Sequence, residues 1–240
     1  MAVGPVLDGF FLARAGRFRA LQPRPKGRPR LSVVGSSPLR VLVTGAGLAA
    51  GYGVTRQEDG LGGILTTALA EATGRGVVTE VSAAPVLPAS RAVAHIGLVG
   101  AHTFDVAVFA PCFLEASFRP GAGVPRHGAE IVRHLRDTGG PMLQVLLLGI
   151  PAPAGGSAFD RAAGKAASVT NGVLQQLADR HPGVVYVDAP AFHSVHDRRP
   201  FDPGYYADAG ARVARTASPA YTRSVRTSTT DRSSEVASPR

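Results

Sequence analysis

Residues 39–53, which read LRVLVTGAGLAAGYG, join an apolar run to a glycine-rich turn. The run at 39–44 has the composition of a strand that is buried on both faces. Small residues follow it up to Gly53, as they do where a backbone turns tightly or approaches a ligand closely. Two kinds of functional loop share this pattern. One binds the pyrophosphate of a dinucleotide, and the other presents a nucleophilic side chain.

The dinucleotide interpretation rests on Gly45, Gly47 and Ala50, which satisfy a relaxed form of the Gly-x-Gly-x-x-Gly fingerprint. In that fingerprint a helix starts inside the glycine loop, so that its N-terminus faces the phosphates. Here residues 51–60 intervene before any helical periodicity begins. The acidic residue of the second strand, Glu80, also lies 30 residues after Ala50, whereas the fingerprint places it about 20 residues on. We therefore expect no dinucleotide, and no other cofactor.

Strand and helix patterns alternate along the middle of the chain. The predicted strands are 39–44, 77–83, 104–112, 142–150 and 183–188, and the predicted helices are 60–74, 89–99, 126–138, 159–180 and 206–216. Strands separated by helices, without hairpin signals between them, are typical of parallel sheets. The sequence predicts an α/β fold: a three-layer α/β/α sandwich with a five-stranded parallel sheet and helices on both faces.

The charge of the chain is concentrated at its two ends. The net charge is +9, yet residues 41–214 hold 13 basic and 14 acidic residues. Residues 1–40 hold eight basic residues against one acidic, and residues 215–240 hold five against two. Because the middle part is nearly neutral, we expect no nucleic-acid partner. We divide the chain into an N-terminal segment with a basic, Pro-rich linker (1–38), one domain (39–215) and a disordered Ser/Thr/Arg-rich tail (216–240).

The N-terminal segment has an amphipathic pattern. In a helix, one stripe of it would carry Leu7, Phe10, Phe11, Phe18 and Leu21, interrupted by Arg14. Two interpretations stay open: a helix packed on the body of the protein, or an attachment of residues 7–30 to an anionic membrane surface. The segment lacks a secretory pattern and an apolar run that could span a bilayer, so we expect a cytoplasmic protein. Peripheral association of this protein with a membrane stays an open alternative. The single Cys excludes an intramolecular disulfide.

Four blocks of sequence carry a family resemblance. They are the run from Leu39 through AAGYGV, FDVAVFAP at 104–111, VLLLGIPAP at 145–153 and FDPGYYADAGARVA at 201–214. In order and spacing the chain resembles the SGNH (GDSL-type) hydrolases, a family of esterases and lipases, from Leu39 to about Ala214. The resemblance implies the α/β/α fold and places a nucleophile in the turn after the first strand.

The residues that the family uses for catalysis are replaced at most of the matching positions. Where the family has Gly-Asp-Ser-Leu, residues 45–48 read GAGL, so the serine position is Gly47. The two oxyanion donors fall on Val86 and on Leu114, which replaces an Asn. The family's Asp-x-x-His falls on Asp202, which is retained, and Tyr205, which replaces the base. A triad without nucleophile or base loses nearly all of its contribution, so the resemblance implies an inactive member that binds a small acyl-like ligand, a partner, or neither.

Other side chains could supply a different chemistry. A divergent esterase acting on small acyl esters could use Cys112 at the end of the third strand, with His193 or His196 as its base. The competing interpretation is that Cys112 is a small buried residue and that both histidines belong to a polar surface loop. The His193-x-x-His196 pair lacks further ligands, so we expect no metal.

Overall fold

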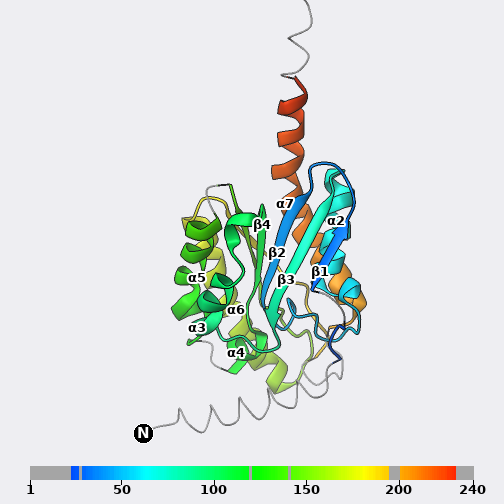
Figure 1. Ribbon diagram of the computed structural model, residues 1–240. Helices are drawn as coiled ribbons and strands as arrows, with labels where there is room; N and C mark the ends of the chain where they lie inside the picture. The colour runs from blue at the N-terminus through cyan, green and yellow to red at the C-terminus, as the bar shows by residue number, and fades with distance from the viewer. Residues whose placement is uncertain (1–22, 27–28, 119–120, 140–141, 195–200, 231–240) are drawn as a thin grey trace, which may run out of the picture.

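A six-stranded sheet forms the centre of the molecule (Figure 1). This computed structural model describes residues 23–26, 29–118, 121–139, 142–194 and 201–230. The strand order is β1-β3-β2-β4-β5-β6. The strands are β1 (Arg30–Val33), β2 (Leu39–Ala46), β3 (Val77–Ala84), β4 (Val106–Ala110), β5 (Gln144–Leu148) and β6 (Val184–Val187). All neighbouring strands from β3 to β6 pair in parallel, as expected for the five predicted strands.

The sixth strand, β1, corrects the predicted strand count. It pairs antiparallel with β3, with Arg30 opposite Glu80 and Val33 opposite Val77. Its sequence RLSV alternates exposed and partly buried residues, which is typical of a strand at an edge of a sheet. These four residues come at the end of the Arg- and Pro-rich run at 22–30 and are too few to show a period, so they fall within the predicted N-terminal segment (1–38). The fold thus begins before residue 39.

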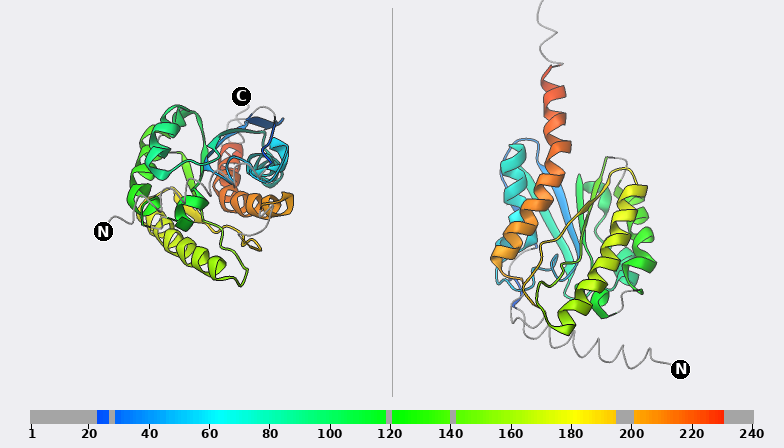
Figure 2. Two further views of the ribbon diagram at one scale, coloured as in Figure 1. Left: turned by 90° about the horizontal axis from the view of Figure 1, so that it is seen from below. Right: turned by 180° about the vertical axis from the view of Figure 1, so that it is seen from behind.

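Helices cover both faces of the sheet (Figure 2). On one face lie α2 (Leu61–Thr73) and α7 (Pro203–Thr230), and on the other lie α3 (Ala89–Gly97), α5 (Val124–Gly139) and α6 (Ala158–Arg180). The short α4 (Phe113–Phe118) follows β4, and the single 3-10 turns are η1 (Gln57–Asp59) and η2 (Ala101–Thr103). Two main hydrophobic clusters fill the spaces between the sheet and these two layers. The predicted three-layer architecture is confirmed.

Helix α7 continues past the predicted end of the domain at residue 215. Ala217 is fully buried, and the Tyr221 hydroxyl donates to the Asp105 carbonyl oxygen over 2.7 Å. Beyond Tyr221 the helix projects past the end of the sheet (Figures 1 and 2). Residues 216–230 are therefore helical, in place of the disordered tail that their polar composition suggested, while residues 231–240 lie outside the described part of the chain.

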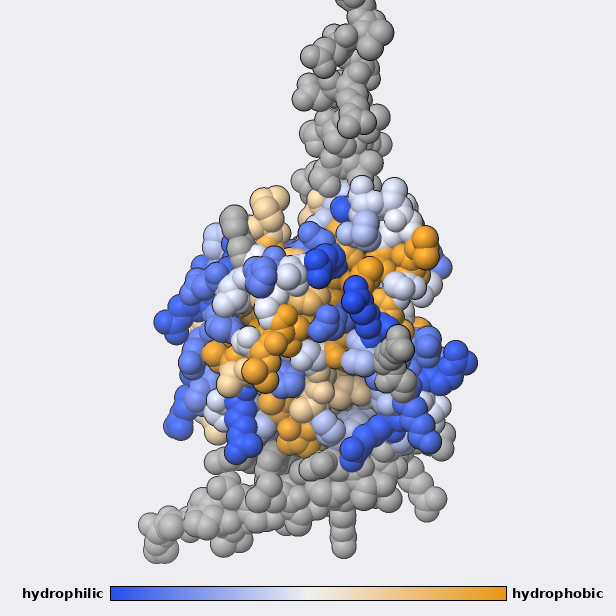
Figure 3. All heavy atoms as spheres, in the orientation of Figure 1, coloured by the Kyte–Doolittle hydropathy of each residue, from blue (hydrophilic) through white to orange (hydrophobic). Residues whose placement is uncertain are grey.

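The surface mixes hydrophilic and hydrophobic side chains. Figure 3 shows hydrophobic side chains exposed over the middle of one face and hydrophilic ones along its sides. The most exposed large apolar side chains are those of Val34, Leu98 and Met142. Within the described ranges, none of the helices combines the length and the apolar character that a bilayer crossing requires.

Candidate functional site

The resemblance places a nucleophile at Gly47, in the turn that follows β2, two residues after Gly45 near the end of that strand. Gly45 has a φ of +118°, and a Cβ built on it would lie 2.0 Å from the Ala110 carbonyl oxygen of the neighbouring strand β4. Gly47 has a φ of +54°, but its Cβ position is open, with the nearest atom, Tyr52 Cδ2, 4.0 Å away. Steric contact therefore requires glycine at position 45 and leaves room for a side chain at position 47.

Three of the predicted site residues meet at the carboxyl ends of the strands, where parallel sheets place their ligand sites. Gly47, Cys112 and Leu114 line one small hollow. The rest of its lining is supplied by Leu48, Tyr52, Pro85, Pro111, Phe113, Pro151 and Phe201. Its volume is about 10 Å³, roughly the space of a single water molecule. The hollow at which the resemblance expects a site is nearly closed and mostly apolar.

Val86 does not line this hollow. Its side chain is partly buried and packs against the hydrophobic cluster on the α3 and α5 side of the sheet. The preceding residue, Pro85, borders the hollow instead. Proline has no N–H group, so the hollow has no backbone donor from position 85.

Aromatic side chains fill the space next to the hollow. The Phe201 ring lies 5.4 Å from that of Phe192 and 5.1 Å from that of Tyr205, measured between centroids. Phe113 stands edge-on to Phe192 at 5.4 Å and to Phe201 at 6.4 Å. Offset and edge-on pairs of this kind stabilise a packed core. Phe113, Phe192, Phe201 and Tyr205 form what we call the aromatic plug.

Tyr205, at the family's base position, belongs to this plug and is buried. Its hydroxyl donates to the Pro190 carbonyl oxygen over 3.1 Å. Burial raises the pKa of Tyr205 well above its ordinary value, because the charged form loses its hydration. A phenol that holds its proton this firmly cannot act as a base at neutral pH.

Two acidic side chains, those of Asp202 and Glu115, serve as helix caps. Asp202 precedes α7, and its Oδ1 accepts the backbone N–H of Tyr205 over 2.8 Å, with Pro203 as the first helical residue. Glu115 is buried, and its Oε2 accepts the backbone N–H of Ala89, the first residue of α3, over 2.8 Å. Both carboxylates therefore have a structural role that does not depend on catalysis. The role of Glu115 had no signal in the sequence, because its partner is 26 residues away.

The proposed cysteine chemistry finds little support in the geometry. Cys112 is buried, whereas His193 is exposed, and within the described chain no hydrogen bond joins them. His196 lies outside the described residues. Loss of hydration on burial, with a smaller contribution from the nearby Glu115, raises the pKa of Cys112 to about 11, while backbone N–H groups oppose the shift. A thiol with this pKa is almost entirely protonated at neutral pH.

We expect alkylation of Cys112 by iodoacetamide to be slow at pH 7. Because only the thiolate reacts, the rate should rise about tenfold per pH unit from pH 7 to pH 10 without reaching a plateau. Mass spectrometry of the folded chain over this pH range measures it, with the urea-unfolded chain as control. The unfolded thiol should level off near its ordinary pKa of about 8.5. Complete labelling of the folded chain within minutes at pH 7 would contradict the structure.

A serine–histidine contact occurs elsewhere, between β3 and α3. The Nε2 of His95 on α3 lies 3.1 Å from the Ser82 Oγ and 3.0 Å from the Ser82 carbonyl oxygen on β3. A carbonyl oxygen only accepts hydrogen bonds, so Nε2 carries a proton and donates it. In this arrangement His95 cannot accept the proton of Ser82. The contact fastens α3 to the sheet.

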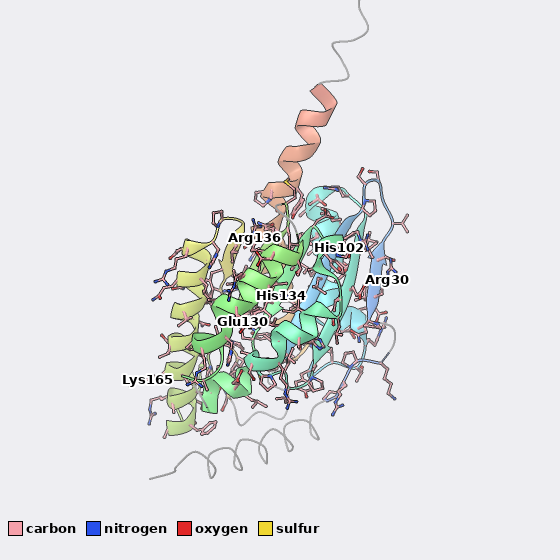
Figure 4. All side chains as sticks on the ribbon, turned by 60° about the vertical axis from the view of Figure 1, so that its left-hand side comes forward. Arg30, His102, Glu130, His134, Arg136 and Lys165 are labelled. Carbon is pink, nitrogen blue, oxygen red and sulfur yellow. The ribbon has the colours of Figure 1, made fainter. Side chains whose placement is uncertain are left out.

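A larger hollow, of about 410 Å³, lies at the C-terminal end of α5. It is lined by Ala129, Arg133, Arg136, Asp137, His181 and Pro182. Figure 4 shows Arg136 on α5, together with His134 and Glu130. The Nη1 of Arg136 donates to the Leu143 carbonyl oxygen over 2.6 Å. Arg136 lies in the last turn of α5, where a cation balances the negative end of the helix dipole, so its position is explained by the fold.

No family model matches the sequence, and no curated protein matches it. Solved structures do match. The lipase Lip_vut3 from a goat rumen metagenome has a TM-score of 0.59 at 21% identity, covering 75% of this chain and 97% of that chain. TesA has a TM-score of 0.59 at 16% identity, covering 75% and 99%. An extracellular lipase from Streptomyces rimosus has a TM-score of 0.56 at 14% identity, with the same coverage as TesA.

The chain has an SGNH hydrolase-like fold. The resemblance inferred from the four sequence blocks is thus confirmed for the fold. The comparisons cover nearly the whole length of each of these structures and about three quarters of this chain. At these identities the likeness concerns the architecture, and the activity has to be argued from the residues at the rim of the sheet.

Proposed function

We propose that this chain is a non-catalytic protein with an SGNH hydrolase-like fold. The observation that carries the proposal is the convergence of Gly47 and Leu114 on one hollow, with Tyr205 buried in the aromatic plug beside it. These are the positions at which the family resemblance expects the nucleophile, the oxyanion amide and the base. None of the three can supply that chemistry, because glycine and leucine have no reactive group and the phenol is protonated.

The size of the hollow also argues against a small acyl-like ligand at this place. A volume of about 10 Å³ holds at most about one water molecule, whereas ligand pockets have volumes of about 300–1,000 Å³. The aromatic plug would have to move before a ligand could enter. We therefore expect the chain to act through contacts of its surface with a macromolecular partner.

Hydrolysis of p-nitrophenyl acetate and butyrate tests the proposal. We expect the rate with the purified chain to equal that of an identical buffer blank, and Cys112→Ala to leave it unchanged. A rate above the blank that disappears in Cys112→Ala would replace the proposal by a divergent cysteine esterase. A rate that persists in Cys112→Ala, together with labelling by a fluorophosphonate probe, would show an activated serine and would also contradict it.

A further inference from the structure

The chain enters the fold at the rim that carries the small hollow. The backbone N–H of Gly53 donates to the Pro23 carbonyl oxygen over 3.2 Å, and that of Lys26 donates to the Thr55 carbonyl oxygen over 3.0 Å. Pro25 packs so closely on Gly51 that a Cβ there would lie 2.8 Å from the Pro25 Cγ. Residues 23–26 are thus fixed to the turn that contains Gly47, and the preceding residues start from this point.

The rim offers an apolar surface with carboxylates near it. Three apolar residues at this rim are only partly buried: Pro85, Val86 and Phe113. The side chains that line the hollow are mostly apolar. Two exposed carboxylates lie at this end of the sheet. Asp188 directly follows β6 and lies 3.7 Å from Arg212, and Asp202 directly precedes α7 and caps it. An apolar centre with acidic groups beside it suits a segment that combines an apolar stripe with basic residues.

The sequence before Pro23 has both properties. Residues 7–21 lie outside the described residues, and their sequence predicts a helix with an apolar stripe and the basic residues Arg14, Arg17 and Arg19. Fifteen helical residues extend about 22 Å, and five parallel strands span about 19 Å between the outer two. The segment is therefore long enough to cross the rim. Since one end is held by residues 23–26, docking is intramolecular and is favoured by a high effective concentration.

We propose that residues 7–21 dock on this rim through their apolar stripe and cover the hollow beside Gly47. The exposed faces of Pro85, Val86 and Phe113 receive the stripe, and Asp188 and Asp202 lie within the reach of its arginines. This docking goes beyond the proposed lack of catalysis. It assigns the N-terminal segment to the body of the protein, in preference to an anionic membrane surface.

Hydrogen–deuterium exchange of the full chain tests the docking. The stripe variant carries Phe10→Ser, Phe11→Ser and Phe18→Ser, and the control carries Leu12→Ser, Ala13→Ser and Ala20→Ser, which would lie off the stripe. We expect amides in 47–55 and 111–117 to exchange about tenfold faster in the stripe variant, because the cover is lost, and to be unchanged in the control. Equal exchange in the stripe variant and the native chain would overturn the proposal.

A second measurement avoids dependence on amide protection. Gly47→Cys in a Cys112→Ala background places one thiol where the Cβ position is open. We expect a thiol reagent to label it about tenfold faster when the three stripe substitutions are added. Equal labelling with and without them would contradict the docking, provided that circular dichroism shows both chains folded.

Two further arms separate the competing explanations. If the native chain is unprotected at the rim and sediments with phosphatidylserine vesicles at low salt, the segment is a membrane anchor and the docking is overturned. The stripe variant is also assayed for ester hydrolysis. Activity that appears only on uncovering the rim would refute the proposed lack of catalysis while supporting the docking, so the two proposals fail in different ways.

Discussion

Gly45→Ala is expected to abolish folding, whereas Gly47→Ala is expected to give a folded protein. A Cβ at position 45 would lie 2.0 Å from the Ala110 carbonyl oxygen, which is held in the ladder between β2 and β4. Neither strand can move aside without breaking that ladder, and a φ of +118° is itself unfavourable for alanine. The loss should exceed about 4 kcal/mol, a large part of a typical stability of about 5–15 kcal/mol.

Gly47→Ala is the matched control, because it adds the same methyl group to a glycine two residues further along the chain. Its Cβ would meet open space, and its φ of +54° costs alanine about 1–2 kcal/mol. Urea unfolding followed by circular dichroism compares the two variants. Equal midpoints for Gly45→Ala and Gly47→Ala would show that the turn does not approach β4 as described.

This pair of variants also distinguishes a glycine that the fold requires from a glycine whose position has room for a side chain. If Gly47 were fixed by close packing, its lack of a side chain would be a requirement of the fold. The open Cβ position leaves room for a side chain at position 47, and only the left-handed φ of +54° opposes one. The carboxylates of Asp202 and Glu115 cap helices, so both have a structural role whether or not the chain catalyses a reaction.

The order of the main elements was predictable because each has a strong period or a long apolar run. Strand β4 is buried throughout, and α6 begins with a Ser157–Asp160 capping box. The sequence did not predict strand β1 or the end of α7, for two different reasons. The four residues of β1 are too few to show a period, and the core contacts of α7 after residue 215, at Ala217 and Tyr221, are hidden among Ser, Thr and Arg.

The site was predictable only where a backbone motif marks it. The glycines located Gly47, and the order of blocks located Leu114, which the structure brings to the same hollow. Contacts between distant residues had no such marker. Pro85, and not the expected Val86, borders the hollow, and Ser82 contacts His95. Both features depend on how neighbouring loops and helices pack. The spacing of residues along the chain does not predict that packing.

Phe201→Ala is expected to remove the centre of the aromatic plug. Phe201 is 1% exposed and packs against Phe192 and Tyr205, so truncation should cost about 3–5 kcal/mol through lost burial and an unfilled cavity. Because Phe201 and Cys112 line the same hollow, the cavity should also make the thiol accessible. Alkylation of Cys112 at a fixed pH, measured by mass spectrometry, should then be faster than in the native chain.

Phe104→Ala distinguishes this local opening from a general loss of stability. Phe104 is also buried, but it precedes β4, at the opposite end of that strand from Cys112, and it does not line the hollow. The Phe104→Ala variant should lose about as much stability as Phe201→Ala, but its alkylation rate at Cys112 should stay near the native value. Faster alkylation in both variants would mean that the thiol reacts through global unfolding. Faster alkylation in Phe201→Ala alone would mean that the aromatic plug keeps the hollow closed, because Phe201 lines the same hollow as Cys112 and Phe104 does not.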